Sequence, residues 1–252
     1  MRWFSRRKTQ AAVPEHGPAY RAGERLYCIG DIHGRADLLA RLHRMIERDA
    51  AGFSGRVQVL YLGDYIDRGH QSREVIESLV SAPLADCESV FLRGNHEQAM
   101  LDFLDYPEAT AGWLRFGGRE TLLSYGVSIS HMPLMKDVSR LAGELRERLP
   151  ASHLDFLQET LLSWRAGDYY FVHAGVRPGV DLEDQHFEDQ LWIREEFIES
   201  VDYHGAVIVH GHTISDEAEI LPNRIGIDTG AFHSGRLTGL VLEGSEQRLL
   251  QT

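Results

Sequence analysis

The chain has 252 residues and a formal net charge of −12, from 26 Lys and Arg against 38 Asp and Glu. This length can supply one large α/β domain, and a hydrophobic content of 43% is enough to bury its core, which argues against a disordered chain. The excess of negative charge argues against general nucleic-acid binding, because phosphate backbones would be repelled.

The sequence contains no candidate secretory or membrane-spanning segment. The basic opening MRWFSRRKTQ is not followed by a long apolar stretch or a small-residue cleavage site, and no other stretch is long enough to span a membrane. Only two cysteines occur, Cys28 and Cys87, and Cys28 lies in an apolar run, so no disulfide framework is expected. These features predict a cytoplasmic protein, and they leave the oligomeric state open.

Residues 1–24 are predicted to form a flexible basic leader, because they contain prolines and glycines without apolar periodicity. Residues 25–252 are expected to form a single domain. Short apolar runs, each ending at a glycine with a polar residue, predict buried strands at 26–31, 57–64 and 89–95. Helical spacing of apolar residues follows at 36–50 and after Ser72. This alternation predicts βαβ units with a largely parallel sheet.

A mainly helical pattern follows the third expected strand. It covers about 98–164 and is predicted to form a cap beside the site. Four further strands are expected at 168–175, 205–213, 223–231 and 235–243.

Five polar clusters follow the expected strands. They are GDIHG (30–34), GDYIDRG (63–69), RGNHE (93–97), HAG (173–175) and HGHT (210–213). Ligands of open α/β sheets lie beyond the carboxyl ends of the strands, so the clusters could meet in one site. Any one cluster is weak evidence, since an isolated strand-end histidine is more often structural. Their joint occurrence in this order favours a common site.

The first two clusters contain groups that could bind a cation. Asp31 and His33 are two residues apart, so an extended backbone would aim both side chains to the same side. Asp64 and Asp67 lie in a glycine-bounded loop, where the two carboxylates would repel each other unless a cation or the adjacent Arg68 neutralised them.

The later clusters supply further candidate ligands. Asn95 and His96 are neighbours whose side chains should diverge, so that one could face a metal and the other a substrate. His173 and His212 stand at the ends of apolar strands.

The motifs GD-x-HG, GD-x-x-DRG, GNHE, HAG and GH occur in this order, and the chain resembles the calcineurin-like metallophosphoesterases. Within them it is similar to the phosphoprotein phosphatase branch, which includes the phosphatase of bacteriophage lambda. The resemblance covers about residues 25–243. It implies an α/β metallophosphoesterase β-sandwich flanked by helices, with a helical cap inserted between the GNHE and HAG motifs.

The resemblance implies a centre of two divalent metal ions, most readily Mn²⁺, with Fe²⁺ or Zn²⁺ as alternatives that suit mixed oxygen and nitrogen ligands. One ion would be bound by Asp31, His33 and Asp64. The other would be bound by Asp64, Asn95, His173 and His212, so that Asp64 bridges the two.

The implied reaction is direct attack of a metal-bridging hydroxide on phosphorus. His96 would protonate the leaving oxygen, and Asp67 would orient His96. Arg68, Arg93 and Arg194 would bind phosphate oxygens through forked donor pairs.

Three features separate this chain from the wider family pattern. His212 is followed by Thr213 and Ile214, so the GH-x-H ending is absent, which fits the protein-phosphatase branch. His70 stands where relatives commonly have proline, and His210 is an additional histidine. The roles of both stay open.

The segment FGGRETLLSYG (116–126) resembles a stretch found in bacterial phosphatases and in symmetrical diadenosine tetraphosphate hydrolases. Trp113, Phe116 and Tyr125 would therefore be either cap core or a wall against adenine or peptide.

The resemblance implies a serine/threonine protein phosphatase that acts on a phosphoprotein, or on a phosphorylated small molecule. A symmetrical diadenosine tetraphosphate hydrolase is the alternative. An inactive binding module is least favoured, because every expected ligand and the general acid are present. The physiological substrate and the native metal pair stay open.

Overall fold

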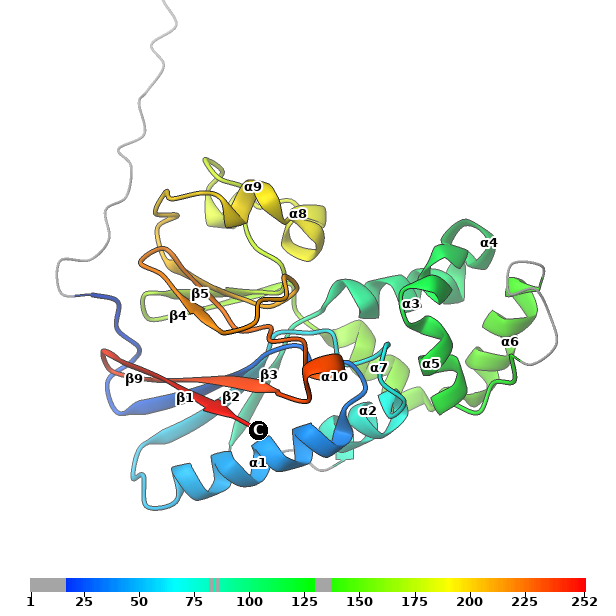
Figure 1. Ribbon diagram of the computed structural model, residues 1–252, viewed down its shortest axis with the longest axis horizontal. Helices are drawn as coiled ribbons and strands as arrows, with labels where there is room; N and C mark the ends of the chain where they lie inside the picture. Colours follow the sequence, from blue (N-terminus) through cyan, green and yellow to red (C-terminus); the bar gives the residue numbers. More distant parts are fainter. Residues whose placement is uncertain (1–16, 82–83, 85–86, 130–136) are drawn as a thin grey trace, which may run out of the picture.

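The structure, a computed structural model, describes residues 17–81, 84, 87–129 and 137–252. Two five-stranded sheets form its centre, and helices flank them (Figure 1). The strand order is β10-β9-β1-β2-β3 in the first sheet and β4-β5-β6-β8-β7 in the second. The expected α/β fold, with paired sheets flanked by helices, is confirmed.

The first sheet contains the two βαβ units expected from the sequence. Its strands are β1 (Glu24–Ile29), β2 (Arg56–Tyr61), β3 (Glu88–Phe91), β9 (Thr238–Glu243) and β10 (Glu246–Gln251). Strands β1, β2 and β3 run parallel, with Cys28 opposite Leu60, and β9 pairs with β1 in the antiparallel sense. Helices α1 (Ala36–Ala50) and α2 (Ser72–Ser81) connect the parallel strands.

The second sheet has three central parallel strands and two antiparallel edges. Its strands are β4 (Ser163–Ala166), β5 (Tyr169–Val172), β6 (Val207–His210), β7 (Glu219–Ile220) and β8 (Arg224–Gly226). Between β5 and β6 lie η3 (Leu182–Asp184), α8 (Phe187–Trp192) and α9 (Glu195–Ile198). Helix α10 (Ala231–Ser234) follows β8. Strands β5, β6 and β8 are shorter than predicted because the polar residues after each belong to a loop, and β4 and β7 were not predicted.

The alternation of side chains along the strands of the first sheet places them in two different layers of the core. Leu26 and Cys28 of β1 pack between the two sheets, whereas Tyr27 and Ile29 face the helical side. Both faces of the first sheet are therefore buried. This explains why its strands read as continuous apolar runs.

The cap is defined here as the described residues of 98–164, which extend to one side of the sheets (Figure 1). It contains α3 from Gln98 on (α3 is Asn95–Asp105), α4 (Pro107–Thr110), η1 (Ala111–Arg115), α5 (Gly118–Ser124), α6 (Val138–Arg148) and α7 (Ala151–Glu159). Trp113 and Tyr125 are 3% and 2% exposed, so both are cap core. Phe116 is 67% exposed and remains available at the surface.

The fold begins before the predicted boundary, so the assignment of residues 1–24 to a flexible leader requires correction. Tyr20 is 3% exposed, and its hydroxyl donates a hydrogen bond to Gln58 Oε1 at 2.6 Å. Its backbone N–H donates to the carbonyl of Gly244 at 2.7 Å. A single aromatic residue carries no periodicity, which is why the pattern did not reveal it. The remainder of the predicted leader, residues 1–16, lies outside the described residues.

Across the described ranges, no helix combines the length and apolar character needed to cross a bilayer.

Candidate active site

The polar clusters after β1, β2, β3, β5 and β6 converge at one edge of the two sheets. Asp64, from the loop after β2, lies within 3.4 Å of both His33 and His173, which follow strands of different sheets. Asn95 Oδ1 contacts His173 Nε2 at 2.9 Å and His212 Nδ1 at 2.8 Å, so both residues belong to the same cluster. The predicted metal ligands are therefore brought together.

Backbone strain is concentrated at this edge. Among the described residues, the non-glycine positions with positive φ are His33 (44°), Asp64 (50°), Asp67 (71°), Arg68 (66°) and His212 (62°). Each is a predicted site residue. A left-handed backbone is unfavourable for such residues and persists only where surrounding contacts enforce it, typically at functional sites.

Asp64 lies at the centre of the cluster, with its two carboxylate oxygens facing different imidazoles. Its Oδ2 is 3.4 Å from His33 Nε2, and its Oδ1 is 3.4 Å from His173 Nε2. Burial alone would raise the pKa of Asp64, but the surrounding histidines, of which His96 is the one protonated at neutral pH, outweigh burial and lower the pKa. Asp64 is therefore ionised, with one oxygen available on each side.

Two groups of side chains around Asp64 could each hold a metal ion. One comprises His33, Asp64 and His96, and the other Asp64, His173 and His212, with ligand atoms within 4.8 Å of one another. His33 and His173 each donate Nδ1–H to a backbone carbonyl, of Ile66 at 2.8 Å and Leu62 at 2.9 Å. This fixes the tautomer that leaves Nε2 unprotonated, as metal ligation requires.

Asn95 completes the second group. Its Oδ1 lies 2.9 Å from His173 Nε2 and 2.8 Å from His212 Nδ1. Asp31 Oδ2 accepts the backbone N–H of His212 at 3.0 Å, which ties the first polar cluster to the last.

Unsatisfied buried atoms test whether cations fit this site. Asp31 Oδ1, His33 Nε2 and His212 Nε2 are buried without a hydrogen-bond partner among the described residues. Buried polar atoms of this kind are costly and rare in folded proteins. Burial lowers the pKa of His33 to about 3 and of His212 to about 2, so both imidazoles are neutral ligands. The residues present therefore fit divalent cations.

His96, which belongs to the first of the two metal-binding groups in place of the predicted ligand Asp31, also forms a hydrogen-bonded pair with Asp67. His96 Nδ1 is 2.7 Å from Asp67 Oδ2, and Asp67 is fully buried. Burial alone would lower the pKa of His96, but Asp64 and Asp67 outweigh it and raise the pKa to about 9. The imidazole can thus carry a proton at neutral pH, as a general acid must.

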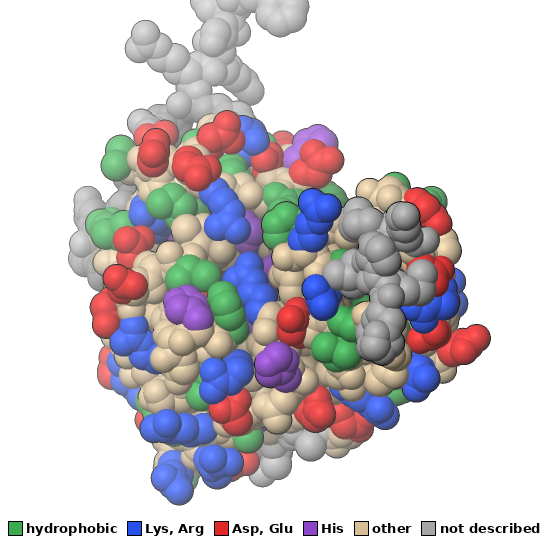
Figure 2. Space-filling model, turned by 45° about the vertical axis from the view of Figure 1, so that its right-hand side comes forward, with side chains coloured by type: hydrophobic (Ala, Val, Ile, Leu, Met, Phe, Trp, Pro, Cys, Tyr) green, Lys and Arg blue, Asp and Glu red, His purple; other side chains and the backbone are tan. Residues whose placement is uncertain are grey.

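Two of the three predicted phosphate-binding arginines lie at the site. Arg68 Nη2 is 3.3 Å from His96 Nε2, and its guanidinium lies 4.8 Å from the centre of the Phe232 ring. Arg194 Nη1 donates to the carbonyl of His212 at 3.2 Å. Figure 2 shows Lys or Arg side chains along the hollow between the sheets and the cap, with histidines at its base.

The guanidinium of Arg93 is held by contacts within the chain. Its Nε donates to Thr160 Oγ1 at 3.0 Å, and its Nη2 donates to the carbonyls of Leu157 at 3.2 Å and Gln158 at 2.7 Å. Nη1 donates to Gln98 Oε1 at 3.0 Å. These contacts engage Arg93 at the C-terminal end of α7, at Thr160 just beyond it and at Gln98, which gives it a structural role. Its contact with phosphate stays a prediction.

His70 and His210, whose roles the sequence leaves open, differ in exposure. His70 is exposed, one residue beyond the DRG motif. His210 is buried against Phe197, with ring centres 5.1 Å apart, and neither metal-binding group found in the described residues includes it.

Sequence reasoning missed two buried carboxylates. Glu97 accepts backbone N–H groups of Gly94, Asp64 and Tyr65 at 2.8–2.9 Å and thus fixes the loop after β2. Asp228 follows β8, and its negative charge, together with burial as the larger cause, raises the pKa of Asp31. Asp228 Oδ2 has no hydrogen-bond partner among the described residues. The available signal for Asp228 was its position directly after an apolar strand, as for Asp31.

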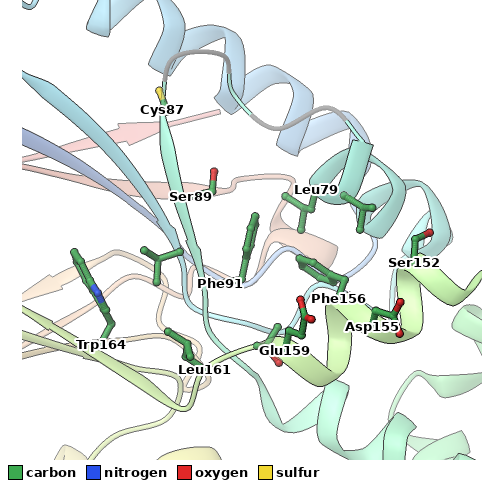
Figure 3. A pocket seen from close by; sticks show the side chains of 13 residues that line it. Leu79, Cys87, Ser89, Phe91, Ser152, Asp155, Phe156, Glu159, Leu161 and Trp164 are labelled. Atoms are coloured by element: carbon green, nitrogen blue, oxygen red, sulfur yellow. The ribbon is translucent and has the colours of Figure 1, made fainter.

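A groove of about 820 Å³ lies between β3 and α7 (Figure 3). Phe91, Phe156 and Trp164 line it, and none of the predicted site residues does. This groove is therefore separate from the candidate active site.

Known proteins resemble the chain over most of its length. A curated relative, the asymmetrical bis(5'-nucleosyl)-tetraphosphatase PrpE of Anoxybacillus flavithermus, is 25% identical over 232 residues, covering 84% of this chain and 88% of that protein. Serine/threonine-protein phosphatase 2 of Escherichia coli is 24% identical over 225 residues, with coverages of 84% and 90%.

A solved structure, described as a putative diadenosine tetraphosphatase, has a TM-score of 0.62 at 18% identity. The similarity covers 92% of this chain and 98% of that one, and it supports the metallophosphoesterase fold.

The family model for calcineurin-like phosphoesterases matches residues 24–229, from the start of β1 to the loop after β8. Members of this family use a dinuclear metal centre, which agrees with the two metal-binding groups that share Asp64. The chain therefore belongs to the calcineurin-like phosphoesterases, a family of metal-dependent phosphoric ester hydrolases.

Proposed function

We propose that this protein is a phosphomonoesterase that removes phosphate from phosphoserine and phosphothreonine in proteins. The observation that carries the proposal is the placement of Asp64 between two metal-binding groups, with the buried His96–Asp67 pair beside it. Cations held by these groups would neutralise the charge of a phosphate, and His96 stands next to them as a proton donor.

The proposed ligands are Asp31, His33 and Asp64 for one cation, and Asp64, Asn95, His173 and His212 for the other. Two bound cations, proposed to be Mn²⁺, would neutralise phosphate charge and lower the pKa of coordinated water. The chain itself orients the ligands, because the Leu62 and Ile66 carbonyls hold the two imidazole tautomers described above.

The remaining residues act on the substrate. Arg68 and Arg194 would bind phosphate oxygens, since each has guanidinium donors near the histidine cluster. His96 would donate its Nε2 proton to the leaving oxygen, while Asp67 accepts the Nδ1–H and keeps the ring in orientation.

A general acid oriented by the His96–Asp67 pair favours a phosphate monoester of an alcohol as the substrate. A serine or threonine alkoxide is a poor leaving group and needs a proton in the transition state. Cleavage of a phosphoanhydride expels a phosphate group, which departs with less help. A fully buried Asp67 devoted to orienting His96 is therefore most useful for phosphoserine and phosphothreonine.

A dinucleoside polyphosphate hydrolase is the second candidate. Trp192 is 50% exposed and lies edge-on to His212, with ring centres 6.3 Å apart, and Phe232 lies against Arg68 and His33. These aromatic rings could stack on nucleobases. The PrpE relative has this substrate class in its name.

Initial rates with Mn²⁺ would test the proposal. Purified protein would be assayed on a phosphoserine peptide, a phosphotyrosine peptide and diadenosine tetraphosphate, and we expect the highest kcat/KM on the phosphoserine peptide. A preference of more than about tenfold for the dinucleotide would overturn this assignment. Two ADP would then indicate symmetrical cleavage, and ATP with AMP asymmetrical cleavage. Bound metal without turnover of any substrate, including p-nitrophenyl phosphate, would indicate an inactive binding module.

His96→Asn tests the role of the general acid. Serine alkoxide needs a proton and nitrophenolate does not, so kcat should fall by about 10²-fold or more on the phosphoserine peptide and much less on p-nitrophenyl phosphate. Metal content, measured by elemental analysis, should stay at that of the wild type. Equal losses on both substrates would show that His96 has another role.

A further inference from the structure

Two side chains of the cap hold the carboxylate of Asp67. The indole N–H of Trp113 donates to Asp67 Oδ2 at 2.6 Å, the same oxygen that accepts from His96 Nδ1 at 2.7 Å. The hydroxyl of Thr121 donates to Asp67 Oδ1 at 2.5 Å. Trp113 comes from η1 and Thr121 from α5, whereas Asp67 follows β2.

The cap also holds the backbone of this loop. The N–H of Asp67 donates to Thr121 Oγ1 at 2.9 Å, and the N–H of Arg68 points to the carbonyl of Gly117 at 3.4 Å. A Cβ on Gly117 would lie 2.4 Å from the backbone nitrogen of Arg68, so glycine is needed for this approach. Asp67 and Arg68 have the left-handed backbone that such contacts must maintain.

We propose that Trp113 and Thr121 are positioning residues for the general acid. Their two hydrogen bonds hold the Asp67 carboxylate in a fixed orientation, so that the Nε2–H of His96 faces the leaving oxygen. The proposal rests on the proposed function, in which His96 donates that proton. It also gives a reason for the Gly-Gly-x-x-Thr segment, since a Cβ on Gly118 would lie 2.5 Å from the Trp113 ring.

A purely structural role makes a different prediction. Trp113 is buried and packs on Phe103 with ring centres 5.0 Å apart, so its removal could simply loosen the cap. Loosening would reduce activity on all substrates alike. A defect in the general acid would depend on the leaving group, because only poor leaving groups need the proton.

The test uses Trp113→Phe and Thr121→Val in the full chain with Mn²⁺. Loss of a hydrogen bond to a charged group should lower kcat on a phosphoserine peptide by about tenfold, and kcat on p-nitrophenyl phosphate by less than about twofold. KM and metal content should match the wild type. Thr121→Ser retains the hydroxyl and should restore activity on the peptide.

Tyr125→Phe is the matched control. It removes a buried cap hydrogen bond, from the Tyr125 hydroxyl to His153 Nδ1 at 2.9 Å, that does not involve Asp67. It should lower the free energy of unfolding without changing the ratio of the two kcat values. Urea unfolding of all variants would show whether stability and the kcat ratio change independently.

A double-mutant cycle completes the test. If Trp113 acts through His96, Trp113→Phe should cause no further loss in the His96→Asn background. Full additivity, or equal losses of Trp113→Phe on both substrates, would overturn the positioning role alone. Equal losses of His96→Asn on both substrates would instead overturn the general-acid assignment, and the positioning role with it.

Discussion

The loop after β2 supplies the central carboxylate of the site and sets the tautomers of two histidines beside it. It supplies Asp64, and its Leu62 and Ile66 carbonyls accept the Nδ1–H groups of His173 and His33. One short segment thus provides the central carboxylate and sets the tautomer of an imidazole on each side of it. Glu97 holds that segment by accepting the N–H groups of Asp64 and Tyr65. Contacts within the chain therefore orient the candidate ligands around Asp64.

Asp64→Asn should weaken both metal sites together. The two Asp64 oxygens face different groups, and an amide has one weaker oxygen donor and a nitrogen that cannot ligate. We expect bound Mn²⁺, measured by elemental analysis after gel filtration, to fall below one ion per chain, with activity near background. Two retained ions with near-normal turnover would contradict the central position of Asp64. Asp102→Asn, on the cap helix α3, is the control and should retain both ions.

His43 should make the protein sensitive to acid independently of the metal centre. Burial lowers its pKa to about 4 from 6.5, and its Nε2 contacts the Tyr61 hydroxyl at 2.9 Å. The unfolded chain then binds the proton more readily, so this contribution to stability is complete above pH 6.5 and is lost as the pH falls toward 4.

The comparison is between wild type and His43→Gln in urea unfolding at several pH values. Relative to the variant, the wild type should lose up to about 1.4 kcal/mol for each pH unit below the unfolded pKa. Parallel curves for wild type and His43→Gln would contradict the buried, neutral state of His43.

At the scale of elements, the sequence predicts seven strands and the helices that connect β1, β2 and β3, because their signals are local, whereas β4, β7 and β10 were not predicted. The runs at 26–31 and 57–64 correspond to β1 and β2, and the Leu spacing at 36–50 to α1. Contacts between the cap and the sheets were not predictable in this way. Trp113 and Arg93 each have two plausible environments in the sequence, and only the tertiary fold brings one to Asp67 and the other to the end of α7.

Arg93→Lys and Arg68→Lys should separate a helix-capping arginine from a phosphate-binding one. Arg93 donates to the last carbonyls of α7, so a lysine with fewer donors should lower the free energy of unfolding by about 1–3 kcal/mol and change KM little. Arg68→Lys should do the reverse, with a lower kcat/KM and near-normal stability. Urea unfolding and steady-state kinetics on p-nitrophenyl phosphate would measure both. A raised KM with unchanged stability for Arg93→Lys would support the phosphate contact predicted from the motif.

At the scale of the whole molecule, the two sheets must keep a fixed relation, because the proposed ligands around Asp64 come from both. His33 follows β1 of the first sheet, whereas His173 and His212 follow β5 and β6 of the second. Residues 19 and 20, which precede β1, hydrogen-bond to both sheets. The Ala19 N–H donates to Asp168 Oδ2 at 2.9 Å beside β5, and the Tyr20 N–H donates to Gly244 beside β9.

Two truncations should therefore behave differently. Removing residues 1–16 leaves Ala19 and Tyr20 in place, and we expect the free energy of unfolding and turnover of p-nitrophenyl phosphate to be unchanged. Removing residues 1–20 also removes a buried Tyr side chain and its hydrogen bond to Gln58, which should cost about 2–4 kcal/mol. Tyr20→Ala in the full-length chain should reproduce most of that loss, which assigns it to the side chain and not to chain length. Urea unfolding of the metal-free forms gives the comparison without a contribution from bound cations. If the longer truncation were as stable as the wild type, Tyr20 would not be part of the core, and the fold would begin at β1 as the sequence alone suggested.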